Sequence, residues 1–296
     1  MRNFHFSPRF LLTASMVIFG TLGLFTRNIS VSSGELALCR AVLASAFILV
    51  YLTVSGQKPS LKNGISSHIK KELPLLLLSG MAMGVNWVLL FQAYRYTTIS
   101  MATLSYYFAP VIVIAACPLL FHEKMTLRQL FCFVMSTAGL VLIIGAGGAG
   151  NGTDFIGVLF GLGAAVFYAA VILMNKRIRQ VTGIHRTLIQ FGGAILILLP
   201  YVILTGGFHP QLLDGPGLAS LLIVGLIHTG VTYCMYFSAL KDLSGQETAL
   251  LSYIDPLVAA LISVLLLGEP MTAVQALGGA MILGFTLLNE LPGKKG

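Results

Sequence analysis

The stretch ALKDLSGQETALLSYIDPLVAALISVLLLGEPMTAVQ, residues 239–275, decides how the rest of the chain is interpreted. It reads as an apolar helix with Asp255 and Pro256 near its middle, followed by a short turn and the start of another helix. The same pattern occurs 146 residues earlier, at residues 93–129, without a gap. Its identical positions include Ala93, Tyr107, Pro110, Glu123, Met125, Thr126 and Gln129, which correspond to Ala239, Tyr253, Pro256, Glu269, Met271, Thr272 and Gln275. Two ungapped copies predict an internal repeat.

The composition indicates a membrane protein. Of the 296 residues, 56% are hydrophobic and only 9% are charged, whereas a soluble domain usually carries about 25% charged residues. Several apolar runs of about 20 residues are long enough to cross a bilayer. The net charge of +8 lies mainly in the loops between these runs. That placement is typical of a cytoplasmic membrane face and argues against nucleic acid as a partner.

The apolar runs predict an all-α integral membrane protein with ten transmembrane helices. We expect them at residues 9–27, 35–54, 73–93, 99–121, 126–145, 154–174, 186–205, 217–240, 245–267 and 272–290. With the N-terminus inside, fifteen Lys and Arg residues fall at cytoplasmic ends and loops, and only Arg27 and Arg95 fall on the other side. This bias predicts a multi-pass protein of the cytoplasmic membrane with both termini inside.

Five helices in each repeat is an odd number, so the second copy enters the membrane from the opposite side. The expected organisation is a first repeat at 1–146, a glycine-rich linker at 147–153, a second repeat at 154–290 and a tail at 291–296. Inverted repeats are typical of secondary transporters, whose site lies near the midplane between the halves. The chain has no Walker, H-E-x-x-H or G-x-S-x-G motif, so we expect neither an enzyme nor a cofactor or metal site.

Asp255 is the most informative polar residue within the expected helices, because an acid near mid-bilayer costs about 2.5–3.5 kcal/mol on insertion scales. Pro256 bends the same helix and leaves the carbonyl of Ser252 without its helical donor, and Pro110 is expected to bend its own helix in the same way. One interpretation is a site for substrate or a coupling ion. The other is a buried ion pair with Arg40 of the second helix, and the two are compatible because such a pair can act as a gate.

Further polar and aromatic residues fall at matching positions of the two repeats. Asn86 and Trp87 correspond to Thr232 and Tyr233, and Tyr106 and Tyr107 lie beside Pro110. We expect a substrate site formed by Asn86, Trp87, Tyr106, Tyr107, Thr232, Tyr233, Tyr236, Ser252, Tyr253 and Asp255. Its aromatic faces suit aromatic or cationic substrates. His228 is either a proton-coupling residue or a hydrogen-bonded structural residue, and Tyr51, Tyr94 and Tyr96 are assigned to the membrane interface.

Two other patterns have structural interpretations. Glu123 and Glu269 each end a helix and precede Met-Thr, which is sufficiently explained as a turn with a capping threonine. Small residues in the fifth and tenth helices, including Gly139, Gly278 and Gly279, allow close helix packing. That packing places these helices either at the seam between the halves or in a homodimer.

Several elements resemble the EamA-type branch of the drug/metabolite transporter superfamily. Phe19-Gly20 resembles its W-G opening, with Phe in place of Trp, and Leu38-Cys39-Arg40-Ala41 resembles its arginine element in the second helix. The repeated segments from Pro110 to Glu123 and from Pro256 to Glu269 resemble the end of its domain. The resemblance implies a ten-helix carrier of two inverted repeats. Members of this family mostly export amino acids, related metabolites or cationic drugs.

We therefore expect a secondary transporter, with export favoured, that moves a small molecule such as an amino acid or an amphiphilic or cationic compound by alternating access. Proton coupling through Asp255 is the expected energy source. One alternative is an importer of a cationic or amine solute. A membrane enzyme acting on lipids is disfavoured, because its clustered acids or metal ligands are missing from the ten scattered Asp and Glu residues.

Overall fold

The computed structural model describes residues 7–55, 67–121, 125–147, 152–181, 183–240, 242–243 and 245–290. Within these residues the chain is helical and has no strand. Seven helices are long and apolar enough to cross a membrane, and three shorter apolar helices bring the number to the ten that the sequence predicts. The predicted all-α membrane fold of two five-helix repeats is confirmed.

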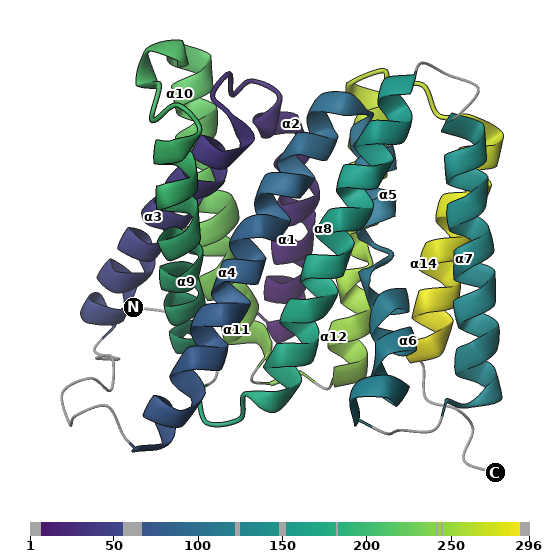
Figure 1. Ribbon diagram of the computed structural model, residues 1–296, viewed down its shortest axis with the longest axis horizontal. Helices are drawn as coiled ribbons and strands as arrows, with labels where there is room; N and C mark the ends of the chain where they lie inside the picture. Colours follow the sequence, from purple (N-terminus) through teal and green to yellow (C-terminus); the bar gives the residue numbers. More distant parts are fainter. Residues whose placement is uncertain are drawn as a thin grey trace.

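The helices stand side by side, with their long axes running between the two ends of the molecule (Figure 1). The first repeat contains α1 (Pro8–Gly20), α2 (Leu22–Thr26), α3 (Ser33–Val54), α4 (Ser67–Tyr96), α5 (Ile99–Tyr106), α6 (Ala109–Phe121) and α7 (Leu127–Gly147). The second contains α8 (Gly152–Arg177), α9 (Gly183–Leu204), η2 (Pro210–Leu212), α10 (Gly215–Leu222), η3 (Ile223–Val231), α11 (Thr232–Leu240), α12 (Gly245–Ser252), α13 (Ile254–Leu261), η4 (Ile262–Leu266) and α14 (Ala273–Glu290). We call the end where α3 and α10 begin the upper end, as in Figure 1, and the opposite end the lower end.

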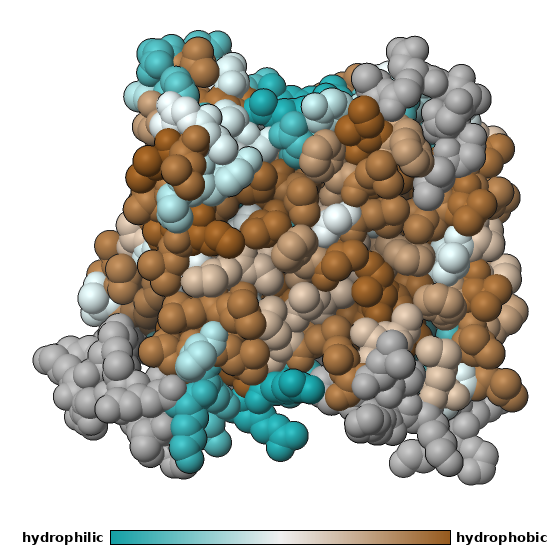
Figure 2. All heavy atoms as spheres, in the orientation of Figure 1, coloured by the Kyte–Doolittle hydropathy of each residue, from teal (hydrophilic) through white to brown (hydrophobic). Residues whose placement is uncertain are grey.

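The surface has the polarity of a membrane protein. In Figure 2 hydrophobic residues cover the middle of the visible face, and hydrophilic residues gather at its upper and lower ends. Large apolar side chains are exposed in the structure, among them Leu196, Ile203 and Leu265. Apolar groups exposed on this scale are stable against lipid chains and unstable against water.

Both helices that contain the matched prolines are interrupted, as expected from Pro110 and Pro256. The first breaks at Tyr107 and Phe108, between α5 and α6, and the second breaks at Tyr253, between α12 and α13. Each break lies just before its proline, which has no N–H to donate to the carbonyl four residues earlier. At the first break the Phe108 N–H bonds the Ser105 carbonyl instead, which tightens the turn.

The stretch η3 is π-helical, and its own side chains support this conformation. Thr229 donates to the carbonyl of Val224 and Thr232 donates to the carbonyl of Ile227, both at 2.8 Å. Each bond spans five residues, which is the spacing of a π-helix. The side chain of Thr232 is therefore used within its own helix.

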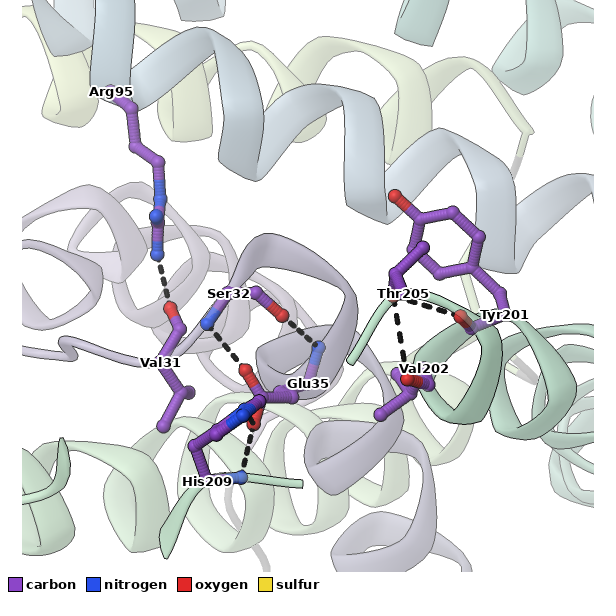
Figure 3. A network of polar contacts seen from close by, with 8 residues as sticks. All are labelled: Val31, Ser32, Glu35, Arg95, Tyr201, Val202, Thr205 and His209. Carbon is purple, nitrogen blue, oxygen red and sulfur yellow. Dashed lines mark hydrogen bonds and ion pairs between the residues drawn. The ribbon is translucent and has the colours of Figure 1, made fainter. Parts of the chain in front are cut away.

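Polar contacts join neighbouring segments at the upper end. Glu35 accepts the Ser32 N–H at 2.7 Å in a capping box that starts α3. The same carboxylate accepts the His209 N–H at 2.5 Å, which anchors the segment after α9 (Figure 3). Arg95 at the end of α4 donates to the carbonyl of Val31. These bonds connect α3, α4 and the α9–α10 connection at one end of the molecule.

Glycines bring two pairs of helices into close contact. A Cβ atom on Gly193 of α9 would lie 2.4 Å from the Leu77 carbonyl oxygen of α4, and one on Gly139 of α7 would lie 2.6 Å from the Gly278 carbonyl oxygen of α14. Real Cβ atoms do not approach backbone this closely. The fifth and tenth predicted helices, α7 and α14, thus pack against each other through Gly139 and Gly278 within one chain. This arrangement corresponds to the predicted packing at the seam between the halves.

Replacing Gly193 with Ala is expected to lower the melting temperature of the purified protein, because the added methyl group forces α4 and α9 apart. The adjacent Gly192 provides a matched control, since a Cβ atom there meets nothing within 4 Å. Gly192→Ala should be neutral or stabilise α9 by up to about 1 kcal/mol through helix propensity. Equal melting temperatures for the two variants would contradict a close contact between Gly193 and α4.

Candidate functional site

The central feature of the molecule is a cavity between the two repeats, with a volume of about 140 Å³. We call it the central cavity. Its walls come from α1 to α5 of the first repeat and from α8, α11 and α13 of the second. The lining residues are Phe19, Leu22, Arg40, Trp87, Leu90, Tyr94, Thr103, Tyr106, Tyr107, Tyr168, Tyr233 and Asp255. Six of them are among the residues that the sequence predicted for the substrate site or gate: Arg40, Trp87, Tyr106, Tyr107, Tyr233 and Asp255.

A second cavity of about 410 Å³ extends from the central one toward the lower end, and we call it the lower cavity. Phe19, Tyr107, Tyr168, Tyr233 and Asp255 line both cavities. The lower cavity also contains Ser252 and Tyr236, which the sequence placed in the substrate site. An upper cavity of about 420 Å³ shares only Tyr94 with the central cavity. The central space is therefore more continuous with the lower end than with the upper end.

Arg40 is the positive group of the central cavity and is only 3% exposed. Its Nε donates to Thr229 Oγ1 at 2.7 Å, and its guanidinium carbon lies 4.5 Å from the centre of the Trp87 ring. Within the part of the chain that the structure describes, its terminal nitrogens have no hydrogen-bond partner. Because a planar guanidinium with free terminal N–H groups matches a carboxylate, Arg40 is suited to bind an anionic group in the cavity.

Asp255 is the negative group of the same cavity. The break at Tyr253 places it in the first turn of α13, where the helix dipole favours a negative charge. Its Oδ2 accepts a hydrogen bond of 2.6 Å from the hydroxyl of Tyr107, which comes from the other repeat. Both Arg40 and Asp255 are described by the structure, and no ion pair joins them. The hypothesis of a direct Arg40–Asp255 pair is therefore wrong for this conformation, and two opposite charges face one cavity without neutralising each other by contact.

Aromatic rings form most of the remaining wall. Tyr106 stacks on Tyr168, with ring centroids 5.1 Å apart, and meets Tyr107 edge to face at 5.7 Å. Tyr233 contacts Phe19 edge to face at 5.4 Å. These contacts limit the rotation of the rings, so the cavity presents a rigid apolar surface between its two charged groups.

Four predicted residues have structural roles away from the three cavities. Asn86 donates to the Ala164 carbonyl at 2.6 Å and joins α4 to α8, while Thr232 bonds within its own helix. Tyr253 is buried at the helix break. His228 has both ring nitrogens within hydrogen-bond distance of partners, the hydroxyl of Thr21 at 2.8 Å and the carbonyl of Ile223 at 3.3 Å. Asn86 and Thr232 were predicted for the site because they lie next to Trp87 and Tyr233 in the sequence. The rotation of each helix instead turns them toward a packed region.

Several cavity residues were missed or misassigned from the sequence. Tyr94 was assigned to the membrane interface but lines the central cavity, because a long helical side chain points back toward the start of its helix. Tyr168 was not predicted for the site, yet it lines both the central and the lower cavity. Arg186 was predicted only as a charge at the cytoplasmic start of the seventh helix. It lies in the first turn of α9 and lines the lower cavity, with Asn175 and Gln190. The signal for Arg186 was its position, which follows Arg40 by the repeat offset of 146 residues.

Glu269 does more than end a helix, so the prediction of a simple turn is corrected. It is 7% exposed, accepts the Ile99 N–H at 2.8 Å, accepts the Ser263 hydroxyl and forms an ion pair with Arg27. These partners connect η4 of the second repeat to α2 and α5 of the first, at the upper end. The capping role belongs to two Thr-to-Gln boxes, Thr126 with Gln129 and Thr272 with Gln275. Glu123 lies outside the described residues.

Comparisons with known proteins agree with this architecture. A model of the EamA-like transporter family matches residues 8–145 and again residues 155–290. The uncharacterized transporter YxxF of Bacillus subtilis is 29% identical over 273 residues, which cover 92% of this chain and 85% of the relative. An uncharacterized transporter of Archaeoglobus fulgidus is 25% identical over 282 residues and 94% of each chain. A solved structure titled "Crystal structure of protein" has a TM-score of 0.63 at 16% identity, covers 94% of this chain and 95% of its own, and supports the fold alone.

Proposed function

The chain belongs to the EamA-like transporter family, and from this premise we propose that it is a secondary transporter for a small zwitterionic metabolite, with amino acids as the first substrates to test. Membrane transport follows from the family and from the names of the relatives. The substrate class, the direction and the mechanism are the proposal.

One observation carries the choice of substrate: the central cavity holds an arginine and an aspartate that are not paired with each other. A buried charge is unfavourable unless a partner compensates it. A zwitterion supplies both partners at once, a carboxylate for Arg40 and an ammonium group for Asp255. The aromatic walls then accommodate an apolar side chain and attract the ammonium group through their ring faces.

The mechanism that we propose is alternating access, with the two repeats rocking around the central cavity. The central cavity shares more of its lining with the lower cavity than with the upper one, and the contacts of Glu269 hold the two repeats together at the upper end. Both observations support a conformation that is open toward the lower end. We place the lower end in the cytoplasm because of the Lys and Arg distribution. A cysteine at Gly207, which follows α9 at the upper end, should then react with a membrane-impermeant reagent in intact cells. Export from the cytoplasm is the direction that the family resemblance favours.

Asp255 is also the group we assign to proton coupling. It faces the same cavity as the substrate, so a proton and an ammonium group would compete for one carboxylate. His228 is less well placed, because its ring nitrogens already have partners and it lines none of the three cavities. Competition for a single site is sufficient to couple the two fluxes, since one ligand leaves before the other binds.

The test uses three related compounds in counterflow with purified protein in liposomes: L-phenylalanine, 2-phenylethylamine and 3-phenylpropionate. The first carries both charged groups, and each of the others lacks one of them. We expect L-phenylalanine to exchange with a KM at least about tenfold lower than either analogue, since one charged hydrogen bond contributes about 1.5–3 kcal/mol. Equal transport of the amine would instead support the alternative of a cationic substrate, and exchange of none of the three, nor of other amino acids, would reject the proposal.

A further inference from the structure

We infer that the lower cavity contains a second binding subsite, in which Arg186 holds the anionic group of the substrate before that group passes to Arg40. This inference rests on the proposed function and adds a site with its own residues. The subsite consists of Asn175, Arg186 and Gln190, with Ser79 behind them. Its ligand is a carboxylate that is carried by the same molecule as an ammonium group.

The first support is the internal symmetry. Arg40 and Arg186 are separated by the repeat offset, and each lies in the second membrane helix of its repeat. Because the repeats are inverted, equivalent residues enter the transport path from opposite ends. Arg40 lies in α3, which begins at the upper end, and Arg186 lies in α9, which begins at the lower end (Figure 1). The path therefore has an arginine on each side of the cavity centre.

The second support is the way the Arg186 side chain is held. Its Nε donates to the Val181 carbonyl at 2.8 Å and one terminal nitrogen donates to the Ile178 carbonyl at 2.9 Å. Both acceptors are neutral, and no ion pair with a carboxylate is formed within the described part of the chain. The nearby Glu72 carboxylate accepts the backbone N–H groups of Arg179, Gln180 and Val181. The guanidinium is thus held by two neutral acceptors, and Arg186 lines the lower cavity.

The third support is an amide network beside Arg186. Gln190 is 5% exposed, and its amide nitrogen donates to Ser79 Oγ at 2.6 Å and to Asn175 Oδ1 at 2.8 Å. These bonds leave the Gln190 carbonyl oxygen and the Asn175 amide nitrogen without partners among the described residues. Both residues line the cavity. They offer an acceptor for an ammonium group and a further donor for a carboxylate.

The shared lining of the two cavities explains how one substrate uses both subsites. Asp255, Tyr107, Tyr168 and Tyr233 line the central and the lower cavity alike. During export the ammonium group can stay near Asp255 while the carboxylate moves from Arg186 to Arg40. Each arginine then meets the substrate at a different stage of transport, and the carboxylate is never without a cationic partner.

The test compares Arg186→Gln with Arg179→Gln, an exposed arginine at the same end that lines none of the three cavities. The probe is L-phenylalanine, whose KM is measured from the cytoplasmic side in inside-out vesicles and from the outer side in intact cells. We expect Arg186→Gln to raise the cytoplasmic-side KM about tenfold, to leave the outer-side KM within about twofold, and to have no effect on 2-phenylethylamine. Arg179→Gln should match the wild type, and Arg186→Lys should recover part of the loss.

A second variant covers the case in which Arg186→Gln loosens the α8–α9 loop and lowers the amount of folded protein. Asn175→Ala leaves the loop bonds of Arg186 intact and should still raise the cytoplasmic-side KM for L-phenylalanine, by about threefold or more. If the wild type transports L-phenylalanine and both Arg186→Gln and Asn175→Ala behave like Arg179→Gln, the second subsite is rejected while the proposed function stands. Equal losses for L-phenylalanine and 2-phenylethylamine would assign Arg186 a purely structural role. If the wild type transports neither compound, both proposals fail.

Discussion

Replacing Asp255 with Asn is expected to abolish gradient-driven transport while leaving the protein folded. The Asn side chain keeps an oxygen that can accept the hydrogen bond from Tyr107, which the structure places 2.6 Å from the carboxylate. It loses the negative charge that the ammonium group or a coupling proton requires. Loss of a charged hydrogen bond of about 1.5–3 kcal/mol corresponds to a decrease of about 10- to 100-fold in substrate affinity. Gradient-driven flux should fall further, because Asn cannot carry a proton.

The melting temperature separates this expectation from the ion-pair hypothesis. If Arg40 depended on Asp255 in a buried pair, removing one partner would cost about 3–5 kcal/mol of stability. The structure shows Arg40 bonded to Thr229 and lying over Trp87 instead, so we expect a small change in melting temperature. Tyr107→Phe serves as the control, because it removes the hydrogen bond and keeps the charge. A large loss of stability in Asp255→Asn that Arg40→Gln restores would establish the direct pair.

Replacing Glu269 with Gln is expected to open the upper end of the transporter. Glu269 holds Arg27, the Ile99 N–H and the Ser263 hydroxyl at the junction of the two repeats. Arg27 is partly exposed, so water compensates some of its loss, and we expect the closed upper end to be destabilised by about 1–3 kcal/mol. A shift of this size changes the ratio of open to closed molecules by about 5- to 150-fold.

The measurement is the labelling rate of a cysteine at Leu90, a residue of the central cavity, in a protein without its native cysteines. Intact cells are treated with a membrane-impermeant maleimide, which reaches Leu90→Cys only when the upper end opens to the outside. The rate should rise at least about fivefold in the Glu269→Gln background. Glu247→Gln is the matched control, since Glu247 pairs with Arg9 at the lower end. Identical rates in all three backgrounds would mean that Glu269 does not restrain the upper end.

Much of the fold follows from the sequence because its signals are local. The apolar runs give the helices, the ungapped repeat gives their arrangement in two halves, and the prolines give the breaks at Tyr107 and Tyr253. Asp255 and Arg40 are recognisable because an isolated charge in an apolar run has no structural explanation of its own. These inferences require only the length, periodicity and chemistry of single segments.

The features that the sequence did not predict depend on how each helix is rotated about its axis and on which helices it contacts. Asn86 and Trp87 are neighbours, yet one bonds α8 and the other faces the cavity, and only the packing of α4 separates them. Glu269 resembled a turn residue because its partners Ile99 and Arg27 are far away in the sequence. Arg186 was hidden by its position near a helix end, where a positive charge normally faces water. Its equivalence to Arg40 was present in the repeat and is the one missed signal that the sequence contained.

The π-helical stretch η3 has a consequence for the symmetry of the transport cycle. Its counterpart in the first repeat, residues 77–85, is α-helical although the two segments align without a gap. A π-helical turn takes up more residues than an α-helical turn, so side chains beyond η3 have a different angular phase from their equivalents in α4. The two repeats therefore cannot exchange conformations through an exact two-fold rotation while η3 keeps its winding. The inward-facing and outward-facing states should differ in energy for this reason, even with no substrate and no gradient present.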